Sequence, residues 1–196
     1  MSLENTLLDF RSDTFTKPSP GMREVMARAE VGDDVFREDP TVNRLEERVA
    51  DLFGREASLM VPSGTMANLI GLALHCQRGD EVIMERHTHS FVHEVGGVAA
   101  LLGVLFNVLD DPDGILAPDQ VEGAIRHRDV HEPISKLLVI ENTVNLTGGR
   151  VVGLDRIEAL HRLTQDRGMR LHMDGARIWH AAVASGTSPA EYAAEV

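Results

Sequence analysis

Apolar residues along this chain follow two patterns, one with the period of a helix and one made of short continuous runs. After Asp39-Pro40, apolar residues repeat at helical spacing until Gly54, which predicts a helix with a glycine stop. Short apolar runs bounded by turn residues predict strands at 57–61, 81–85, 104–109, 136–141 and 170–173. Further helices are predicted at 20–30, 64–76, 154–167 and 178–184, and from 189 onward.

This alternation of strands and helices predicts an α/β fold. Strands separated by helical segments form βαβ units, and these build a mostly parallel sheet covered by helices on both faces. Ligands of such sheets bind beyond the carboxyl ends of the strands. The polar residues that directly follow the predicted strands are therefore the candidates for a functional site.

Composition narrows the class of partner. The 196 residues carry 19 Lys and Arg against 31 Asp and Glu, a net charge of −12, which disfavours the phosphate backbone of nucleic acids. Aromatic residues make up 4%, too few for a base-stacking surface. The single cysteine, Cys76, fits a reducing cytoplasm, and apolar runs such as 98–106 are too short to span a bilayer. We expect a cytoplasmic protein whose partners are neither nucleic acid nor membrane.

Ser63, Gly64 and Thr65 lie where the first predicted strand runs into a helix. Hydroxyls and backbone N–H groups at a helix N-terminus bind anions, so one interpretation is a phosphate site. The other is a capped turn in which Ser63 is the N-cap.

Three histidines, His87, His89 and His93, follow the strand that ends at Glu85. They suggest a metal site, but no carboxylate or thiolate accompanies them at a known ligand spacing, so we predict none. One imidazole can instead stack on a flat cofactor or act as an acid or base. We expect His87 and His93 to be solvated loop residues.

Asp174 ends an apolar strand, where a carboxylate is costly unless it is paired. A pyridinium nitrogen would be a suitable partner, because a buried carboxylate keeps that nitrogen protonated and the ring then accepts electrons. Three residues later, Arg177 offers a bidentate fork to a substrate carboxylate. The alternative is a structural Asp–Arg pair.

Two further polar segments carry weaker signals. Glu141, with Asn142 and Thr143, follows the most β-like run and can contact ring substituents of a cofactor, although loop capping explains these residues better. Ser12 lies in a segment whose residues alone indicate a turn stabilised by side-chain hydrogen bonds.

Together these segments resemble the L-threonine aldolase branch of the fold-type-I pyridoxal-phosphate enzymes. Six stretches carry the resemblance in the order of that family: DFRSDT at 9–14, VGDDVF at 31–36, EDPTVN at 38–43, SGTMAN at 63–68, ENT at 141–143 and HMDGAR at 172–177. The resemblance implies a three-layer large domain like that of aspartate aminotransferase. Residues 1–196 would supply the N-terminal segment and most of this domain, without the small C-terminal domain.

The resemblance also assigns roles. Ser63, Gly64 and Thr65 match the phosphate-binding segment. His89 matches the histidine that stacks on the pyridine ring, and Asp174 matches the partner of the ring nitrogen. The remaining matches are Glu141 in cofactor binding, Arg177 and Ser12 at the substrate carboxylate, and His131 near the substrate side chain.

The implied reaction is retro-aldol cleavage of L-threonine or L-allo-threonine to glycine and acetaldehyde. His89, directly or through a water, is the candidate base for the β-hydroxyl proton. The family is oligomeric, so we expect a homo-oligomer, a dimer or tetramer, with the active site at the subunit interface. The alternatives are a β-eliminating lyase of the same fold, which would release pyruvate and ammonia, and a lysine-less non-catalytic form.

The sequence departs from the family at several positions. Val144 replaces a common histidine and Arg37 a common glycine. The lysine that forms the Schiff base in the family is expected beyond Val196, because the lysines present, Lys17 and Lys136, lie in unrelated contexts.

Overall fold

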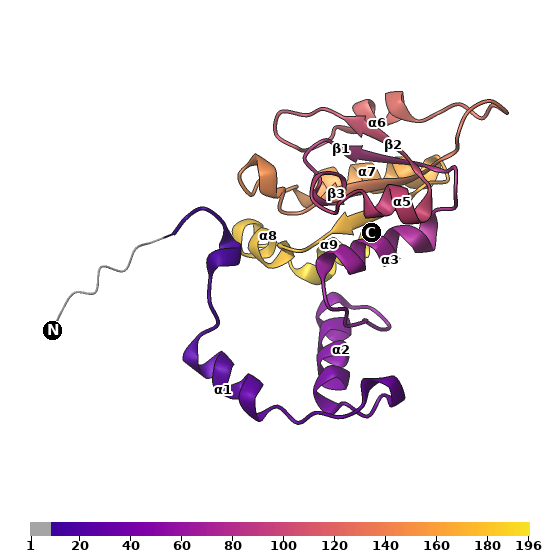
Figure 1. Ribbon diagram of the computed structural model, residues 1–196. Coiled ribbons are helices and arrows are strands. Elements are labelled where there is room, and N and C mark those ends of the chain that lie inside the picture. The colour runs from indigo at the N-terminus through magenta and orange to yellow at the C-terminus, as the bar shows by residue number, and fades with distance from the viewer. Residues whose placement is uncertain (1–8) are drawn as a thin grey trace. The chain divides into compact units, whose positions relative to one another are not determined.

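The computed structural model describes residues 9–196; its first elements are helices, and strands alternate with helices from residue 64 onward (Figure 1). The elements are the 3-10 helices η1 (Asp13–Phe15), η2 (Asp34–Phe36) and η3 (Asn145–Thr147), the strands β1 (Glu81–Glu85), β2 (Leu105–Leu109), β3 (Ser135–Glu141) and β4 (Arg170–Asp174), and the helices α1 (Pro20–Arg28), α2 (Pro40–Phe53), α3 (Gly64–His75), α4 (His89–Val92), α5 (Gly97–Leu102), α6 (Pro118–Ala124), α7 (Leu154–Asp166), α8 (Ile178–Ser185) and α9 (Pro189–Ala194).

The described part of the chain divides into two compact units, residues 9–46 and 47–196. The first unit is organised around Asp39, which is 8% exposed and caps the start of α2. Its Oδ1 accepts hydrogen bonds from the N–H groups of Thr41 and Val42, and its Oδ2 accepts one from Gly32. These N–H groups hold the pKa of Asp39 below its usual range. Arg37, where the family commonly has glycine, adopts a left-handed φ of 59°, the conformation that glycine adopts without strain.

The second unit contains a four-stranded parallel sheet with the order β2-β1-β3-β4. Parallel neighbours require crossover connections, and helices supply them. The carboxyl-terminal residues of the two neighbouring strands β3 and β4, Glu141 and Asp174, pair in register. The parallel α/β architecture predicted from the hydrophobic pattern is therefore confirmed.

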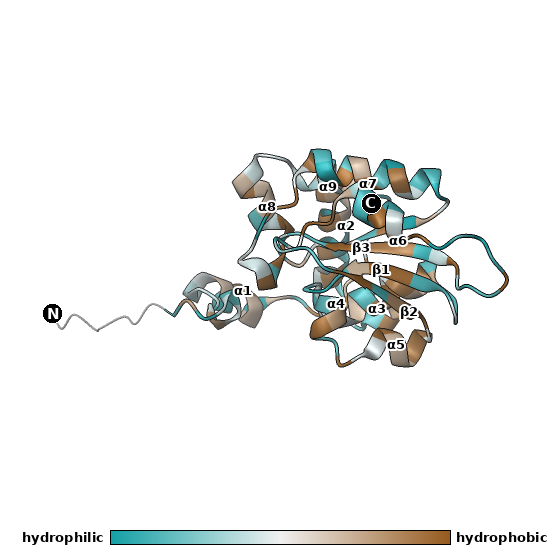
Figure 2. Cartoon of the chain, turned by 90° about the horizontal axis from the view of Figure 1, so that it is seen from above, coloured by the Kyte–Doolittle hydropathy of each residue, from teal (hydrophilic) through white to brown (hydrophobic). Residues whose placement is uncertain are grey.

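Helices cover both faces of the sheet, as Figure 2 shows with the apolar strands between two helical layers. Alternate residues of each strand point to opposite faces. On one face, α3 and α5 pack on an apolar cluster that includes Val82, Met84 and Val139. On the other face, α6, α7, α8 and α9 enclose a larger cluster that includes Ile83 and Leu138. The three-layer arrangement predicted from the family resemblance is thus present.

The amino-terminal edge of the sheet is closed by a buried ion pair. The Glu81 side chain is 1% exposed, and its Oε2 accepts a hydrogen bond from Arg126 Nε at 2.9 Å. Its Oε1 accepts from Ser135 Oγ at 2.9 Å. Arg126 and Ser135 thus satisfy the Glu81 carboxylate at this end of the strands.

The predicted strand at 57–61 is wrong. This segment has no regular secondary structure, and Leu59 and Met60 are 64% and 51% exposed instead of packing on the sheet. A short apolar run has no periodicity that separates a buried strand from an irregular segment. The short helices α4, α5 and α6 were not predicted, since four to seven residues barely display a helical period. No helix within residues 9–196 is long and apolar enough to cross a membrane.

Candidate functional site

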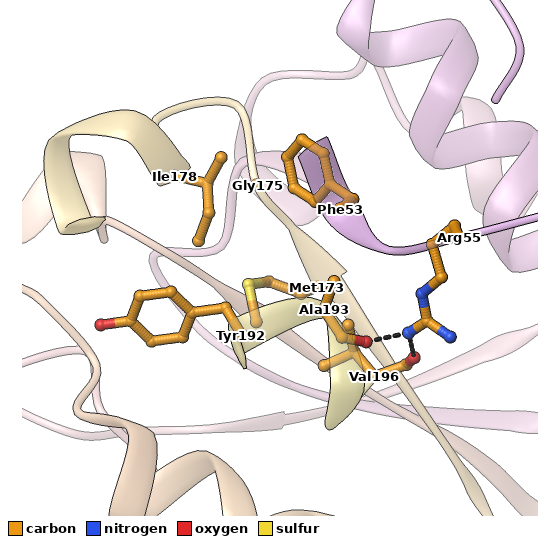
Figure 3. Close-up of a pocket in the computed structure, with 8 residues that line it drawn as sticks. All are labelled: Phe53, Arg55, Met173, Gly175, Ile178, Tyr192, Ala193 and Val196. Carbon is orange, nitrogen blue, oxygen red and sulfur yellow. Dashed lines mark hydrogen bonds between the residues drawn. The ribbon is translucent and has the colours of Figure 1, made fainter. Parts of the chain in front are cut away.

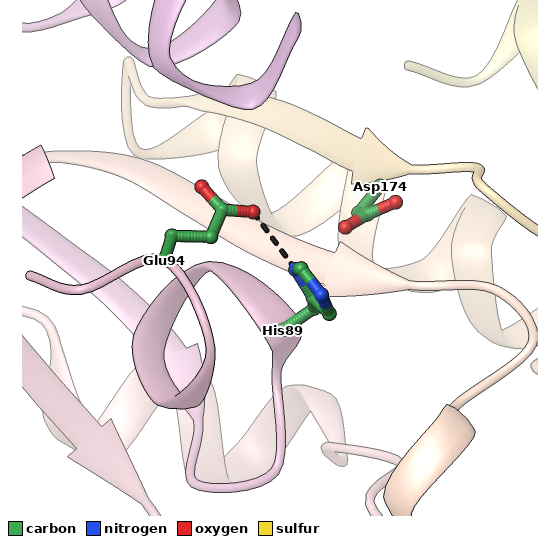
Figure 4. Close-up of side chains that lie close together, drawn as sticks. All are labelled: His89, Glu94 and Asp174. Carbon is green, nitrogen blue, oxygen red and sulfur yellow. Dashed lines mark hydrogen bonds and ion pairs between the residues drawn. The ribbon is translucent and has the colours of Figure 1, made fainter. Parts of the chain in front are cut away.

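Buried polar side chains gather at the carboxyl edge of the sheet, on the face covered by α3. Glu141 ends β3, Asp174 ends β4, and α4 begins with His89 shortly after β1 ends. We call these three residues, together with Asn68 of α3 and Glu94 of the turn after α4, the strand-end cluster. Figure 4 shows His89 between the carboxylates of Glu94 and Asp174.

Asn68 links the two sides of the strand-end cluster. It is 5% exposed, and its Nδ2 donates hydrogen bonds to Asp174 Oδ2 and to Glu94 Oε1, both at 2.8 Å. Its Oδ1 lies 3.1 Å from His172 Nε2. Since two carboxylates can only accept here, the amide nitrogen must face them and the amide oxygen must face His172. Asn68 therefore fixes the separation of Glu94 and Asp174.

Asp174 is a buried carboxylate with unused acceptor capacity. It is 7% exposed, and besides Asn68 it accepts a hydrogen bond from the Ala176 N–H to Oδ1 at 3.0 Å. Both of these donors are neutral. A buried carboxylate is stabilised far more by a cationic donor. The environment of Asp174 therefore fits a protonated ring nitrogen of a ligand.

His89 lies beside this carboxylate and is 34% exposed. Its Nδ1 is 2.9 Å from Glu94 Oε1, and its backbone N–H donates to Glu141 Oε2 at 2.8 Å. Burial raises the pKa of Glu141 above its usual range; the negative charge of Asp174 adds to this, while the N–H groups of His89 and Asn145 oppose it. His89 is thus fixed by its backbone N–H and by one ring nitrogen, and its side chain remains partly exposed to solvent.

The start of α3 places a helix N-terminus on the same element as Asn68. Ser63 is the N-cap, with its Oγ accepting from Met66 N–H at 3.2 Å, so the capped turn that was one of the two interpretations is present. Ser63, Gly64 and Thr65 are exposed, and a Cβ at Gly64 would meet nothing within 4 Å. Asn68 lies five positions after Ser63, which corresponds to a rise of about 7 Å along the helix axis. This distance is comparable to the size of a small aromatic ring with its substituent. That spacing suits a flat ligand with an anionic group at one end.

The other predicted site residues lie elsewhere. Arg177 immediately precedes α8, three residues after Asp174, and is half-buried. His131 lies on an exposed loop before β3, at the amino-terminal edge of the sheet, so this chain alone does not bring it to the strand-end cluster. Ser12 belongs to the first unit, where it caps η1 and its Oγ accepts from Thr14 N–H at 3.2 Å.

The three histidines considered for a metal site do not converge on one point. His87 Nδ1 lies 2.9 Å from Glu85 Oε1, whereas His89 contacts Glu94, and the rings of His89 and His93 are 5.4 Å apart. His89, Glu94 and Asp174 do place one ligand-type atom each within 4.8 Å of one another. However, Asn68 already donates a hydrogen bond to each of these two carboxylates. This arrangement favours an organic ligand, which can contact the same residues, over a metal ion.

Asn68 and Glu94 are the members of the strand-end cluster that sequence reasoning missed. Asn68 sits on the apolar face of a helix, where a buried amide requires partners, and that is the only signal the sequence offers. Glu94 precedes a turn with left-handed Val95 and Gly96, and nothing in the sequence shows that its side chain turns inward.

A separate apolar cavity of about 400 Å³ lies on the other face of β4 (Figure 3). Its walls are mostly apolar and include Phe53, Met173 and Ile178. Its cation, Arg55, donates hydrogen bonds to the backbone oxygens of Ala193 and Val196. Successive residues of β4 face opposite sides of the sheet, so this cavity is distinct from the site at Asp174.

Comparisons with known proteins agree with this geometry. The sequence model described as beta-eliminating lyase matches residues 9–196. The probable low-specificity L-threonine aldolase 2 of Arabidopsis thaliana is 46% identical over 183 residues, which cover 91% of this chain and 52% of that protein. The low specificity L-threonine aldolase of Escherichia coli strain K12 is 43% identical over 181 residues, 92% of this chain and 54% of that protein.

A solved structure shows the same fold. The structure of threonine aldolase from Leishmania major superposes with a TM-score of 0.78 at 25% identity, covering 88% of this chain and 52% of that one. The resemblance inferred from the sequence is confirmed. The chain spans about half the length of the curated relatives it matches.

Proposed function

Because this chain belongs to the beta-eliminating lyase family, we propose that it forms the cofactor-binding part of a pyridoxal-phosphate-dependent aldehyde-lyase. The proposed reaction is cleavage of L-threonine or L-allo-threonine to glycine and acetaldehyde. The observation that carries this proposal is the buried Asp174, which accepts hydrogen bonds from two neutral donors, Asn68 Nδ2 and the Ala176 N–H. The names of the relatives support the aldolase reaction over β-elimination.

The residues at the carboxyl edge fit pyridoxal phosphate. Asp174 would hold the ring nitrogen, and Ser63, Gly64 and Thr65 would hold the phosphate at the start of α3. The His89 imidazole would lie against the ring. Glu141, whose carboxylate already holds the backbone of His89, would shape the same wall of the site.

Each of these residues has a distinct chemical task. When bound, pyridoxal phosphate supplies an electron sink for the pair released as the Cα–Cβ bond of the substrate breaks. Asp174 keeps the ring nitrogen protonated, because its buried negative charge favours a cationic neighbour. His89 accepts the proton of the β-hydroxyl group, so that this oxygen becomes the carbonyl of the aldehyde.

Substrate binding requires a cation for the α-carboxylate. We propose Arg177 for this role, since a guanidinium makes two parallel hydrogen bonds to a carboxylate. Ser12 would assist it, and His131 would contact the substrate side chain from another subunit of a homo-oligomer, dimer or tetramer, with the active site at the interface. That arrangement accounts for the distance of His131 from the strand-end cluster within one chain.

The rest of the proposed enzyme corresponds to the half of the relatives that this chain does not match. We propose that this half supplies the Schiff-base lysine and the small C-terminal domain. Residues 1–196 then contribute the N-terminal segment and most of the large domain, in a cytoplasmic enzyme of amino-acid metabolism.

The test measures the products formed by the full-length protein that carries this sequence. With pyridoxal phosphate and L-threonine, we expect equal amounts of glycine and acetaldehyde. Asp174→Asn should lower the rate by at least about 100-fold, because the neutral amide no longer keeps the ring nitrogen protonated. Asp110→Asn is the matched control, since Asp110 is an exposed carboxylate directly after β2, paired with Arg86. Ammonia and a 2-oxo acid in place of glycine would refute the proposal.

A further inference from the structure

The hydrogen bonds around Asn68 run in one direction only. Its amide nitrogen donates to Asp174 and Glu94, and its oxygen must therefore accept from His172 Nε2. Burial lowers the pKa of His172 to about 4, so this imidazole is neutral near pH 7 and its one ring proton lies on Nε2. The hydrogen-bond partners of Asn68 and His172 thus determine where the protons lie on this side of the cluster.

The same reasoning extends to His89. Glu94 Oε1 already accepts the Asn68 N–H at 2.8 Å, and His89 Nδ1 lies 2.9 Å from the same oxygen. An ionised carboxylate only accepts hydrogen bonds, so Nδ1 must carry a proton. In a neutral imidazole the other nitrogen, Nε2, then has a free lone pair. Without such a partner, neither ring nitrogen of His89 would be preferred as the site of the proton.

Glu94 is held in place at a cost in backbone strain. Its side chain is 1% exposed, and its Oε2 has no hydrogen-bond partner among the described residues. The next residue, Val95, is fully exposed and has a φ of 56°. A left-handed conformation is strained for a β-branched residue, and such strain is found mainly at functional sites. The turn that points Glu94 inward is thus maintained against its own local preference.

We propose that Glu94 is a positioning residue that keeps the His89 proton on Nδ1 and leaves Nε2 as the proton acceptor. Given the proposed aldol cleavage, Nε2 takes the proton from the β-hydroxyl group, the O–H bond breaks and an N–H bond forms. The oxygen electron pair then forms the aldehyde C=O bond as the Cα–Cβ bond breaks, and the pair left on Cα would be taken up by the electron sink that the bound cofactor supplies. Glu94 stabilises the resulting imidazolium, as a carboxylate does in a hydrolase triad. Asn68 keeps this carboxylate at a fixed distance from Asp174.

The chain offers a matched control pair. Glu85 is 3% exposed, and its Oε1 lies 2.9 Å from His87 Nδ1, the same distance as in the pair of Glu94 and His89. Glu85 extends toward the face covered by α7, with Leu116 and Leu160 nearby, and not toward Asp174. The Glu85 side chain forms its hydrogen bonds with His87 and Asp111, so Glu85→Gln removes a comparable pair outside the hydrogen bonds of the strand-end cluster.

The first readout is the tautomer of His89, which requires no turnover. Full-length protein with 15N-labelled histidine is measured near neutral pH by solid-state NMR, and the His89 signals are assigned by their loss in His89→Asn. We expect the proton on Nδ1 in the wild type and in Glu85→Gln, and a shift toward Nε2 in Glu94→Gln. A wild-type protein with the proton on Nε2 would overturn the proposal, whether or not any variant folds.

The second readout is kinetic. For threonine cleavage, Glu94→Gln should lower kcat by about 100-fold or more while KM changes little, because the base is misoriented and the binding groups remain. Glu85→Gln should stay within about twofold of the wild type. A Glu94→Gln enzyme with unchanged kcat overturns the assignment. Absence of threonine cleavage in the wild type overturns the proposed function and the base role, whereas the NMR result still decides whether Glu94 sets the tautomer.

Discussion

Acidification should weaken the fold through one partly buried imidazole, that of His172. His172 packs under α3 so closely that a Cβ on Gly71 would lie 2.6 Å from its Cε1, and its Nε2 is bonded to Asn68. Burial lowers its pKa from 6.5 to about 4; the negative Asp174 opposes this shift, and His75 adds slightly to it. Each pKa unit corresponds to about 1.4 kcal/mol, so the full shift contributes roughly 3 kcal/mol to the free energy of unfolding.

The direction of the effect follows from proton uptake. The unfolded chain protonates His172 near pH 6.5, whereas the folded chain resists protonation until about pH 4. The contribution is therefore complete above pH 6.5 and is lost as the pH falls through that window to 4 and below. Other groups also titrate there, so the informative quantity is the difference between wild type and a variant that lacks this imidazole.

The assay is urea unfolding at about pH 7 and about pH 4 for the wild type, His172→Gln and the control His131→Gln, which removes an exposed imidazole. Between these two pH values, the wild type and His131→Gln should each lose about 2–3 kcal/mol more than His172→Gln. Equal pH dependence in all three proteins would refute the assignment of this stability to His172.

Two further substitutions test how the sheet is supported. Gly71→Ala should lower the free energy of unfolding by about 1–3 kcal/mol, because the new methyl group would meet the ring of His172. Gly123→Ala is the control and should be neutral or stabilising, because a Cβ there meets nothing within 4 Å. Thermal unfolding of the two variants compares them directly. Arg126→Ala should cost about 2 kcal/mol in urea unfolding, because it removes the cation from the buried Glu81 carboxylate, and a loss below about 0.5 kcal/mol would contradict this.

The order of strands and helices in the second unit could largely be predicted from the sequence. In a parallel sheet covered on both faces, most strand residues are buried, so β1 and β3 contain continuous apolar runs that a sequence shows directly. Residue type also fixes helix starts such as Ser63 and Ser188, whose side chains cap α3 and α9 as their positions predict. These signals depend only on residues that are neighbours in the chain, so a single sequence contains them.

The contacts that assemble the site could not be predicted in this way. Asn68 and Asp174 are 106 positions apart, and only the packing of α3 on β4 brings them together. Glu94 looks like an ordinary loop residue until the left-handed turn at Val95 directs it inward. The strand prediction at 57–61 is wrong for the opposite reason. Its apolar residues have the local pattern of a strand, but the segment does not pair with the sheet.

The most direct test of the central claim follows the α-carbon of the substrate. L-threonine labelled with 13C at Cα is incubated with the full-length protein and pyridoxal phosphate, and the products are followed by 13C NMR. Retro-aldol cleavage at the strand-end cluster predicts that the label appears in glycine, with an equal amount of acetaldehyde. Label in a 2-oxo acid, with release of ammonia, would contradict the account, because the Cα–Cβ bond would then have remained intact.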